Sequence, residues 1–270
     1  MRARHAATMA ALALASFLFM TAAPAQDRDA AFTFIVTGNT YPESPFNGFT
    51  EALPALVSRI TGENPLFVVH TGNLVQGGSE RVGIIERDLT RQFALFMAAF
   101  KGLPVPLYTL AGARDLHNDS AVLYENRLKR ELCYSCAISG VHMVFLNTLI
   151  DENGPANLKN TLAWLKNDLK SARGGRVIVF THYCPFDRKG TDRFTWSGPV
   201  HGLLKEHPAS AVISGSEPVY YSLEKDGVRY INSGCGGFNR EDRCSRCSQY
   251  YRASFSENGI DLSPVSIPLR

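Results

Sequence analysis

The sequence has almost no excess of charge of either sign. Its 270 residues carry 28 lysines and arginines against 25 aspartates and glutamates, a formal net charge of +3. Arg2 and Arg4 lie in an N-terminal segment that we expect to be removed, so the mature chain carries 3 − 2 = +1. A balance so close to neutral gives no indication of the basic surface that binds nucleic acid or an anionic membrane. We therefore expect neither as a partner.

Long apolar runs are also scarce, and the one that stands out begins the chain. The segment "MRARHAATMAALALASFLFMTAAPAQ" has a basic start, an apolar run too short and too alanine-rich to span a membrane well, and Ala23-Pro24-Ala25 as a small-x-small cleavage site. We expect residues 1–25 to be a signal peptide and the protein to be periplasmic or secreted. An uncleaved membrane anchor is the alternative, and no second apolar stretch or flanking block of charge supports it.

Internal repeats, low-complexity tracts and clear linkers are absent too, which favours one α/β domain over residues 26–270. Seven short apolar runs, each ending in glycine and polar residues, are typical of strands buried on both faces. They lie at 32–41, 65–73, 104–115, 141–148, 176–185, 210–218 and 228–237. Apolar residues at helical spacing predict two core-facing helix stripes, Val82, Ile85, Leu89, Phe93, Phe96 and Phe100 in one and Leu158, Leu162, Leu165 and Leu169 in the other.

Ligands of such sheets collect at the carboxyl ends of the strands, so the residues that close the apolar runs are the candidate site. These residues are Asn39, Tyr41, His70, Asn73, Arg114, Asp115, His182, Cys184, Ser216, Glu217 and Cys235. Asn73 raises a question of chemistry, because it lies in the glycine-rich loop "VVHTGNLVQGG". A loop of this shape commonly carries a carboxylate that binds a metal ion, and here it offers a neutral amide.

The order and spacing of "TGNTY", "HTGNLVQGG", "LAGARD", "FTHYCPF", "SGSEPVYY" and "YINSGCGG" resembles the calcineurin-like metallophosphoesterases. The five blocks of that family read GDxH, GDxxxxG, GNH(D/E), a lone His and GHxH. The likeness covers nearly the whole mature chain. It implies a four-layer αββα sandwich, in which two mixed β-sheets are flanked by helices. It also implies that all the block residues meet at one rim of the sandwich.

The resemblance further implies where metal ligands would lie. In that family two divalent metals share a bridging Asp, and the other ligands are His, Asp and Asn. Asn39 and Tyr41 take the positions of the first block's Asp and His, and Asn73 takes the position of the bridging Asp. In the third block, Ala113 replaces a ligand Asn and Arg114 replaces a His near the leaving group. Ser216 and Pro218 replace the last two His. Of the ligand positions only His182 is retained, and Asp115 also keeps the family's residue.

These substitutions remove the charge on which a metal pair depends. Two cations held close together repel, and carboxylates offset that repulsion. Amides at 39 and 73 remove two negative charges, alanine and proline offer no side-chain lone pair, and Arg114 adds a positive charge. We therefore expect no metal cofactor and no metal-dependent catalysis. The alternative is a hydrolase with a rebuilt site around His182, Arg114, Asp115 and Cys184.

A pseudoenzyme of this kind would act by binding an unknown protein or a small anionic ligand. Arg114, His182 and the N–H groups of the glycine loops could hold an anion such as phosphate. Alternatively, Asn39, Asn73 and Ser216 merely satisfy loop backbone groups, and Tyr41 and Asp115 pair with Arg114 and close the pocket. For His70 we expect a role in hydrogen-bonded packing.

Six cysteines, Cys133, Cys136, Cys184, Cys235, Cys244 and Cys247, favour disulfides in an exported chain. We expect at least two, one of them involving the polar loop around Cys244 and Cys247, with the pairing left open. Cys133 and Cys136 lead into a strand, so a bond between them would need a turn. A structural zinc site formed by the two C-x-x-C pairs is the alternative.

Overall fold

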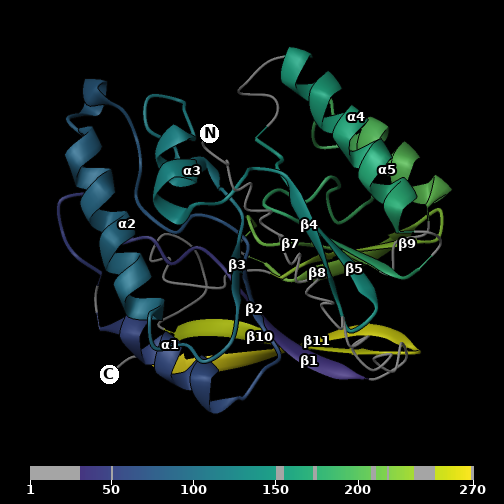
Figure 1. Ribbon diagram of the computed structural model, residues 1–270, viewed down its shortest axis with the longest axis horizontal. Coiled ribbons are helices and arrows are strands. Elements are labelled where there is room, and N and C mark those ends of the chain that lie inside the picture. The colour runs from purple at the N-terminus through teal and green to yellow at the C-terminus, as the bar shows by residue number, and fades with distance from the viewer. Residues whose placement is uncertain are drawn as a thin grey trace, which may run out of the picture.

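The protein folds as a sandwich of two mixed β-sheets with helices on both outer faces (Figure 1). This computed structural model describes residues 31–49, 51–149, 155–172, 175–207, 211–217, 219–233 and 247–268. The expected four-layer αββα arrangement is confirmed. Within the described residues no helix is both long and apolar enough to cross a membrane.

Among the described residues, one sheet has five strands in the order β11-β10-β1-β2-β3. The parallel strands are β1 (Phe32–Thr37), β2 (Val68–His70) and β3 (Leu107–Thr109), and the antiparallel hairpin is β10 (Cys247–Ser256) with β11 (Gly259–Pro268). The helical segments of this half are α1 (Ala52–Gly62), η1 (Glu80–Val82), α2 (Glu86–Phe100), η2 (Ala113–Asp115) and α3 (Val122–Leu128). Of these, α1, α2 and α3 cover the outer face (Figure 1).

The other sheet, in the part of the chain that the structure describes, has six strands in the order β4-β5-β6-β7-β9-β8. Its parallel strands are β5 (Val141–Leu146), β6 (Val177–Thr181), β7 (Ala211–Ser214) and β9 (Val228–Asn232), and its antiparallel edges are β4 (Tyr134–Ile138) and β8 (Tyr221–Lys225). The helices α4 (Pro155–Ser171) and α5 (Ser197–Glu206) cover its outer face (Figure 1).

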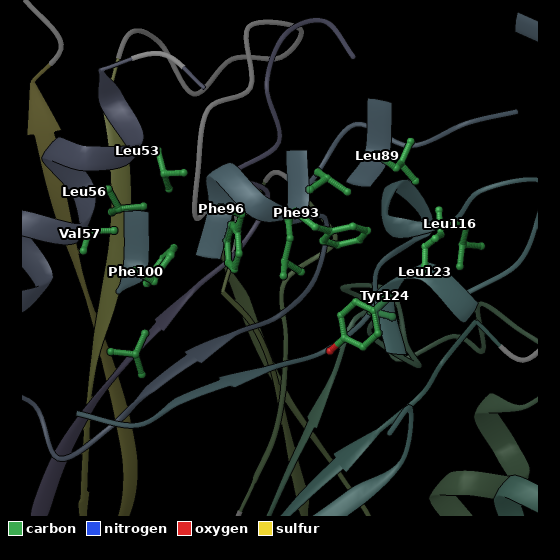
Figure 2. Packing of buried hydrophobic residues seen from close by; sticks show 14 of the residues in the cluster. Leu53, Leu56, Val57, Leu89, Phe93, Phe96, Phe100, Leu116, Leu123 and Tyr124 are labelled. Atoms are coloured by element: carbon green, nitrogen blue, oxygen red, sulfur yellow. The ribbon is translucent and has the colours of Figure 1, made fainter. Parts of the chain in front are cut away.

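Three apolar layers hold the sandwich together. Between the sheets, aromatic rings stack, with Phe34 and Phe67 centroids 4.6 Å apart and Phe145 and Phe180 centroids 5.1 Å apart. A second layer lies under α1, α2 and α3 (Figure 2), and a third under α4 and α5. The central strands are therefore buried on both faces, which is why they form continuous apolar runs in the sequence.

The helix stripes are only partly as predicted. Leu89, Phe93, Phe96 and Phe100 are buried on α2, and Leu158, Leu162, Leu165 and Leu169 pack against the layer under α4 and α5. The expectation for Val82 and Ile85 is wrong, because these side chains are 67% and 41% exposed. Both residues precede α2, which begins at Glu86. At that start the Ile85 N–H donates to the Asp88 carboxylate at 3.1 Å. Helical spacing does not apply before that point.

The cysteines differ from the expectation. Cys133, Cys136 and Cys184 are free thiols. Three free thiols leave at most one pair among the other three, so the expected two disulfides do not form in this structure. Cys136 packs between the sheets and Cys133 against the layer under α4 and α5, which disfavours a zinc ion shared by the two. Cys247 begins β10 and is not part of a loop, while Cys235 and Cys244 lie outside the described residues.

Candidate functional site

The loops after β1, β2, β3, β6 and β7 meet at one rim and enclose a pocket of about 410 Å³, which we call the strand-end pocket. Its lining residues are Asn39, Tyr41, Asn73, Gly77, Gly78, Ala113, Arg114, His182, Tyr183 and Ser216. The structure thus brings together the residues at the family's ligand positions, except Pro218, which lies outside the described residues. The other candidates do not line the pocket: these are His70, Asp115, Cys184 and Glu217, and Cys235 lies outside the described residues. Tyr183 was not among those candidates.

The two amides of the pocket bond to each other and to the backbone. Asn39 and Asn73 have left-handed backbones, with φ of 52° and 57°, a conformation that asparagine tolerates well. Asn39 Nδ2 donates to the Gly215 carbonyl at 2.6 Å, and Asn73 Nδ2 donates to Asn39 Oδ1 at 2.8 Å. Asn73 Oδ1 accepts the Arg114 N–H at 2.9 Å. The amides therefore tie the loops together, which was one of the two alternatives considered.

Glycines allow these loops to approach so closely. A Cβ atom on Gly112 would lie 2.4 Å from both the N and the Oδ1 atoms of Asn73. On Gly72, which has a φ of +104°, a Cβ would lie 2.6 Å from His182 Nδ1. Any larger residue at these positions would push the loops apart.

The buried carboxylate of Asp115 organises the loop after β2. Oδ1 accepts the N–H groups of Leu74 and Val75 at 2.7 and 3.0 Å, and Oδ2 accepts those of Asn73 and Gly112, both at 2.8 Å. Burial raises the pKa of Asp115 to about 7, and the four N–H donors oppose this rise. Through these four hydrogen bonds the side chain of Asp115 holds residues 73–75 against Gly112.

Arg114 is held in place by an aromatic ring and a chain of glutamines. Its guanidinium carbon lies 4.4 Å from the centre of the Tyr41 ring, and Nη1 donates to Gln76 Oε1 at 2.9 Å. Buried Gln92 on α2 in turn accepts the Gln76 N–H at 2.7 Å. One alternative paired Arg114 with both Tyr41 and Asp115. The contact with Tyr41 is present, but Asp115 bonds to backbone N–H groups instead. A polar Gln92 within an apolar helix stripe was the sequence signal for this chain of contacts.

The loop N–H groups that could have held an anion are already bonded within the protein. Those of residues 73, 74, 75 and 112 donate to Asp115, and that of Gln76 donates to Gln92. Gly77 and Gly78 donate to the carbonyls of Arg114 and Leu116 at 2.6 and 3.1 Å. The alternative in which these N–H groups hold an anion is therefore wrong.

The two histidines near the pocket are neutral. His182 Nδ1 lies 2.7 Å from the Thr71 carbonyl, which can only accept, so Nδ1 carries the proton and Nε2 the lone pair. Burial lowers the pKa of His182 to about 4, so the ring brings no positive charge near pH 7. His70 bonds to Thr40 Oγ1 at 2.9 Å and to the Gly72 N–H at 3.3 Å. Its packing role is as predicted, and burial lowers its pKa to about 3.

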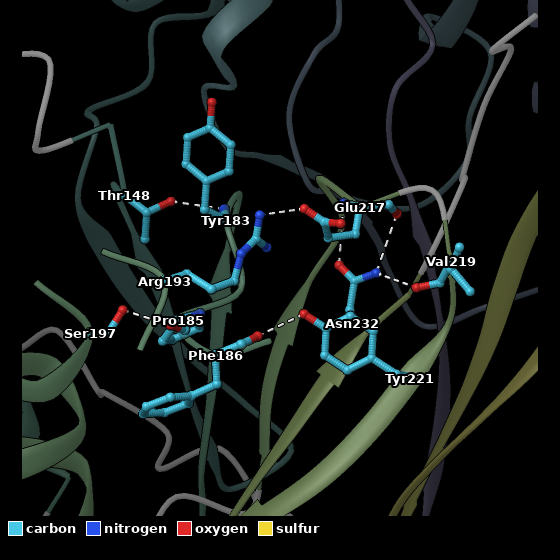
Figure 3. A network of polar contacts seen from close by, with 10 residues as sticks. All are labelled: Thr148, Tyr183, Pro185, Phe186, Arg193, Ser197, Glu217, Val219, Tyr221 and Asn232. Carbon is cyan, nitrogen blue, oxygen red and sulfur yellow. Dashed lines mark hydrogen bonds and ion pairs between the residues drawn. The ribbon is translucent and has the colours of Figure 1, made fainter. Parts of the chain in front are cut away.

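A second polar network fixes the loops after β6 and β7 (Figure 3). Arg193 forms an ion pair with Glu217, and Asn232 Nδ2 donates to the carbonyls of Glu217 and Val219 at 3.2 and 2.7 Å. Cys184 of the β6 loop is fully buried in the core. It lies outside the pocket lining, so the structure does not place it in a rebuilt site.

A model of the calcineurin-like phosphoesterases matches residues 32–220. The chain belongs to this family. Among solved structures, GAP50 of Plasmodium, "the anchor in the inner membrane complex", is 17% identical with a TM-score of 0.62, covering 87% of this chain and 84% of that chain. A dimetal phosphatase from Danio rerio is 14% identical with a TM-score of 0.62, covering 88% and 99%.

A purple acid phosphatase from yellow lupin (Lupinus luteus) is 13% identical with a TM-score of 0.63, covering 90% of this chain and 52% of that chain. At such identities the likeness of this family member to the solved structures concerns the fold alone. No curated protein matches its sequence.

Proposed function

We propose that this calcineurin-like phosphoesterase is an exported, catalytically inactive member of its family that binds a small anionic ligand or a protein at the strand-end pocket. One observation carries the proposal. The oxygens of Asn39 and Asn73 accept hydrogen bonds from an amide and from a backbone N–H, where a metal pair would need carboxylate oxygens. The basic and apolar segment before Ala25 supports export.

The residues of the pocket do not fit two divalent cations. The lining described above has no carboxylate, and Arg114 brings a positive charge to it. Within the described residues, no three His, Cys, Asp or Glu side chains lie together so that they could hold a metal ion. Neutral amides and one imidazole would leave the repulsion between two cations without compensation. GAP50 of Plasmodium, a structural neighbour described as an anchor, supports a role in binding for this fold.

A rebuilt hydrolase is the second candidate, and the lone pair on His182 Nε2 is the observation that favours it. Its residues are poorly suited to this task. A pKa of about 4 makes His182 a weak base near pH 7. The Asp115 carboxylate is saturated by backbone donors, and Cys184 is enclosed in the core.

The test is a hydrolysis assay with aryl phosphate mono- and diesters in manganese, iron or zinc. We expect wild type and Asn73→Asp to show no metal-dependent rate above a His182→Ala control. One restored charge leaves Ala113 and Ser216 unable to complete a metal shell, and Arg114 still opposes cations. A metal-dependent rate in wild type that His182→Ala abolishes would establish the rebuilt hydrolase instead.

A further inference from the structure

The strand-end pocket offers one positive charge and no negative one. Of its lining residues in the described part of the chain, Arg114 alone is formally charged near pH 7, because burial keeps His182 neutral. Such a pocket attracts a monoanion. A phosphate monoester carries about −1.5 to −2 charges at pH 7 and needs several donors arranged around a tetrahedron. The backbone donors that could supply them are already bonded to Asp115 and to other groups of the protein.

Arg114 lines the pocket, and two contacts restrict its guanidinium. Stacking on Tyr41 and the bond from Nη1 to Gln76 restrict the guanidinium, and Gln92 restricts Gln76 in turn. In the described part of the chain, Nε and Nη2 of Arg114 have no hydrogen-bond acceptor. A planar guanidinium with free donors along one edge matches the two oxygens of a carboxylate.

Ser216 supplies an independent indication of a ligand. Its Oγ atom is buried and has no hydrogen-bond partner among the described residues, and the residue lines the same pocket. A buried hydroxyl without a partner costs free energy, so such a group commonly bonds to a ligand or a bound water. Tyr41 and Tyr183 add aromatic walls that can cover the apolar body of a ligand. A volume of about 410 Å³ is in the range of small-molecule sites.

We propose that the ligand of the strand-end pocket is a carboxylate attached to an aromatic or apolar body, held by Arg114 and Ser216. The inference rests on the proposed binding function and names its ligand class. The carboxylate belongs either to a small organic acid or to the free C-terminus of a peptide. Both would present the same two oxygens to Arg114.

The test is isothermal titration calorimetry at pH 7 with benzoate, benzamide and phenyl phosphate as probes. Benzoate is expected to bind at one saturable site, more tightly than phenyl phosphate, and benzamide is expected not to bind. Arg114→Gln should weaken benzoate by about tenfold or more, and Arg114→Lys nearly as much, since lysine lacks the planar fork. Ser216→Ala should weaken it less. Arg127→Gln, which removes the same charge from an exposed position on α3, should have no effect.

A peptide ending in phenylalanine, with a free or an amidated C-terminus, distinguishes the two sources. Tighter binding of the free-acid peptide than of benzoate assigns the carboxylate to a protein partner, and the reverse assigns it to a small acid. The inference is overturned if benzoate does not saturate, if Arg114→Gln binds it as wild type does, or if phenyl phosphate binds equally well or better. None of these results bears on the hydrolysis assay, so the proposed lack of catalytic activity is tested separately.

Discussion

Asn73 has a left-handed backbone and carries a neutral amide where the family resemblance implies a bridging carboxylate. The amide differs from a carboxylate in one further respect, because its nitrogen donates to Asn39 Oδ1. In Asn73→Asp an anionic oxygen would face the Asn39 oxygen instead. The two asparagines therefore form a matched pair, and the loss of charge at one position is accommodated by the other.

Among substitutions that change a single heavy atom, we expect Asp115→Asn to lower the free energy of unfolding the most. In Asp115→Asn an NH₂ group would face two backbone N–H donors, which would be left buried without an acceptor. We expect a loss of about 3 kcal/mol or more in the free energy of unfolding, measured with urea. Asp119→Asn is the matched control, because Asp119 is exposed and its φ of 60° suits asparagine, so it should change stability by about 0.5 kcal/mol or less. Equal effects of the two substitutions would contradict the role given to Asp115.

At the scale of elements, the sequence indicates strands that are buried on both faces and misses those buried on one. β1, β5, β6 and β7 contain continuous apolar runs and are predicted. β10 alternates instead, with Tyr251, Ala253 and Phe255 buried and Arg252 and Ser254 exposed between them. β8 and β11 each lie at the edge of a sheet, and β8 also alternates between half-buried and exposed residues. A prediction based on continuous apolar runs therefore misses such strands.

The loop that joins β3 to η2 should tolerate no side chain at Gly112. Gly112→Ala would place a Cβ 2.4 Å from Asn73 and 2.8 Å from His182 Cε1, so we expect a loss of about 1 to 3 kcal/mol in urea unfolding. Gly102→Ala is the control, because nothing lies within 4 Å of its Cβ position. It should leave stability unchanged or raise it by up to about 1 kcal/mol. If Gly112→Ala behaves like the control, the close approach of the loops is not as described.

At the scale of the whole molecule, topology accounts for the part of the site that could be predicted. The carboxyl ends of parallel strands meet at one edge, so residues that close separate apolar runs converge without any knowledge of their contacts. The bonds between them could not be predicted in the same way. The backbone N–H groups that donate to Asp115, and the hydrogen bonds that link Gln92, Gln76 and Arg114, depend on distances between loops. Sequence spacing does not give these distances.

The central claim, that the strand-end pocket holds no catalytic metal pair, is tested most directly by elemental analysis of the purified mature protein. We predict that wild type, produced with manganese, iron and zinc present, carries no more of these metals per chain than His182→Ala. The comparison isolates the pocket, because zinc bound by cysteines would be unchanged in the variant. Two metal ions per chain in wild type, lost in His182→Ala, would contradict the account.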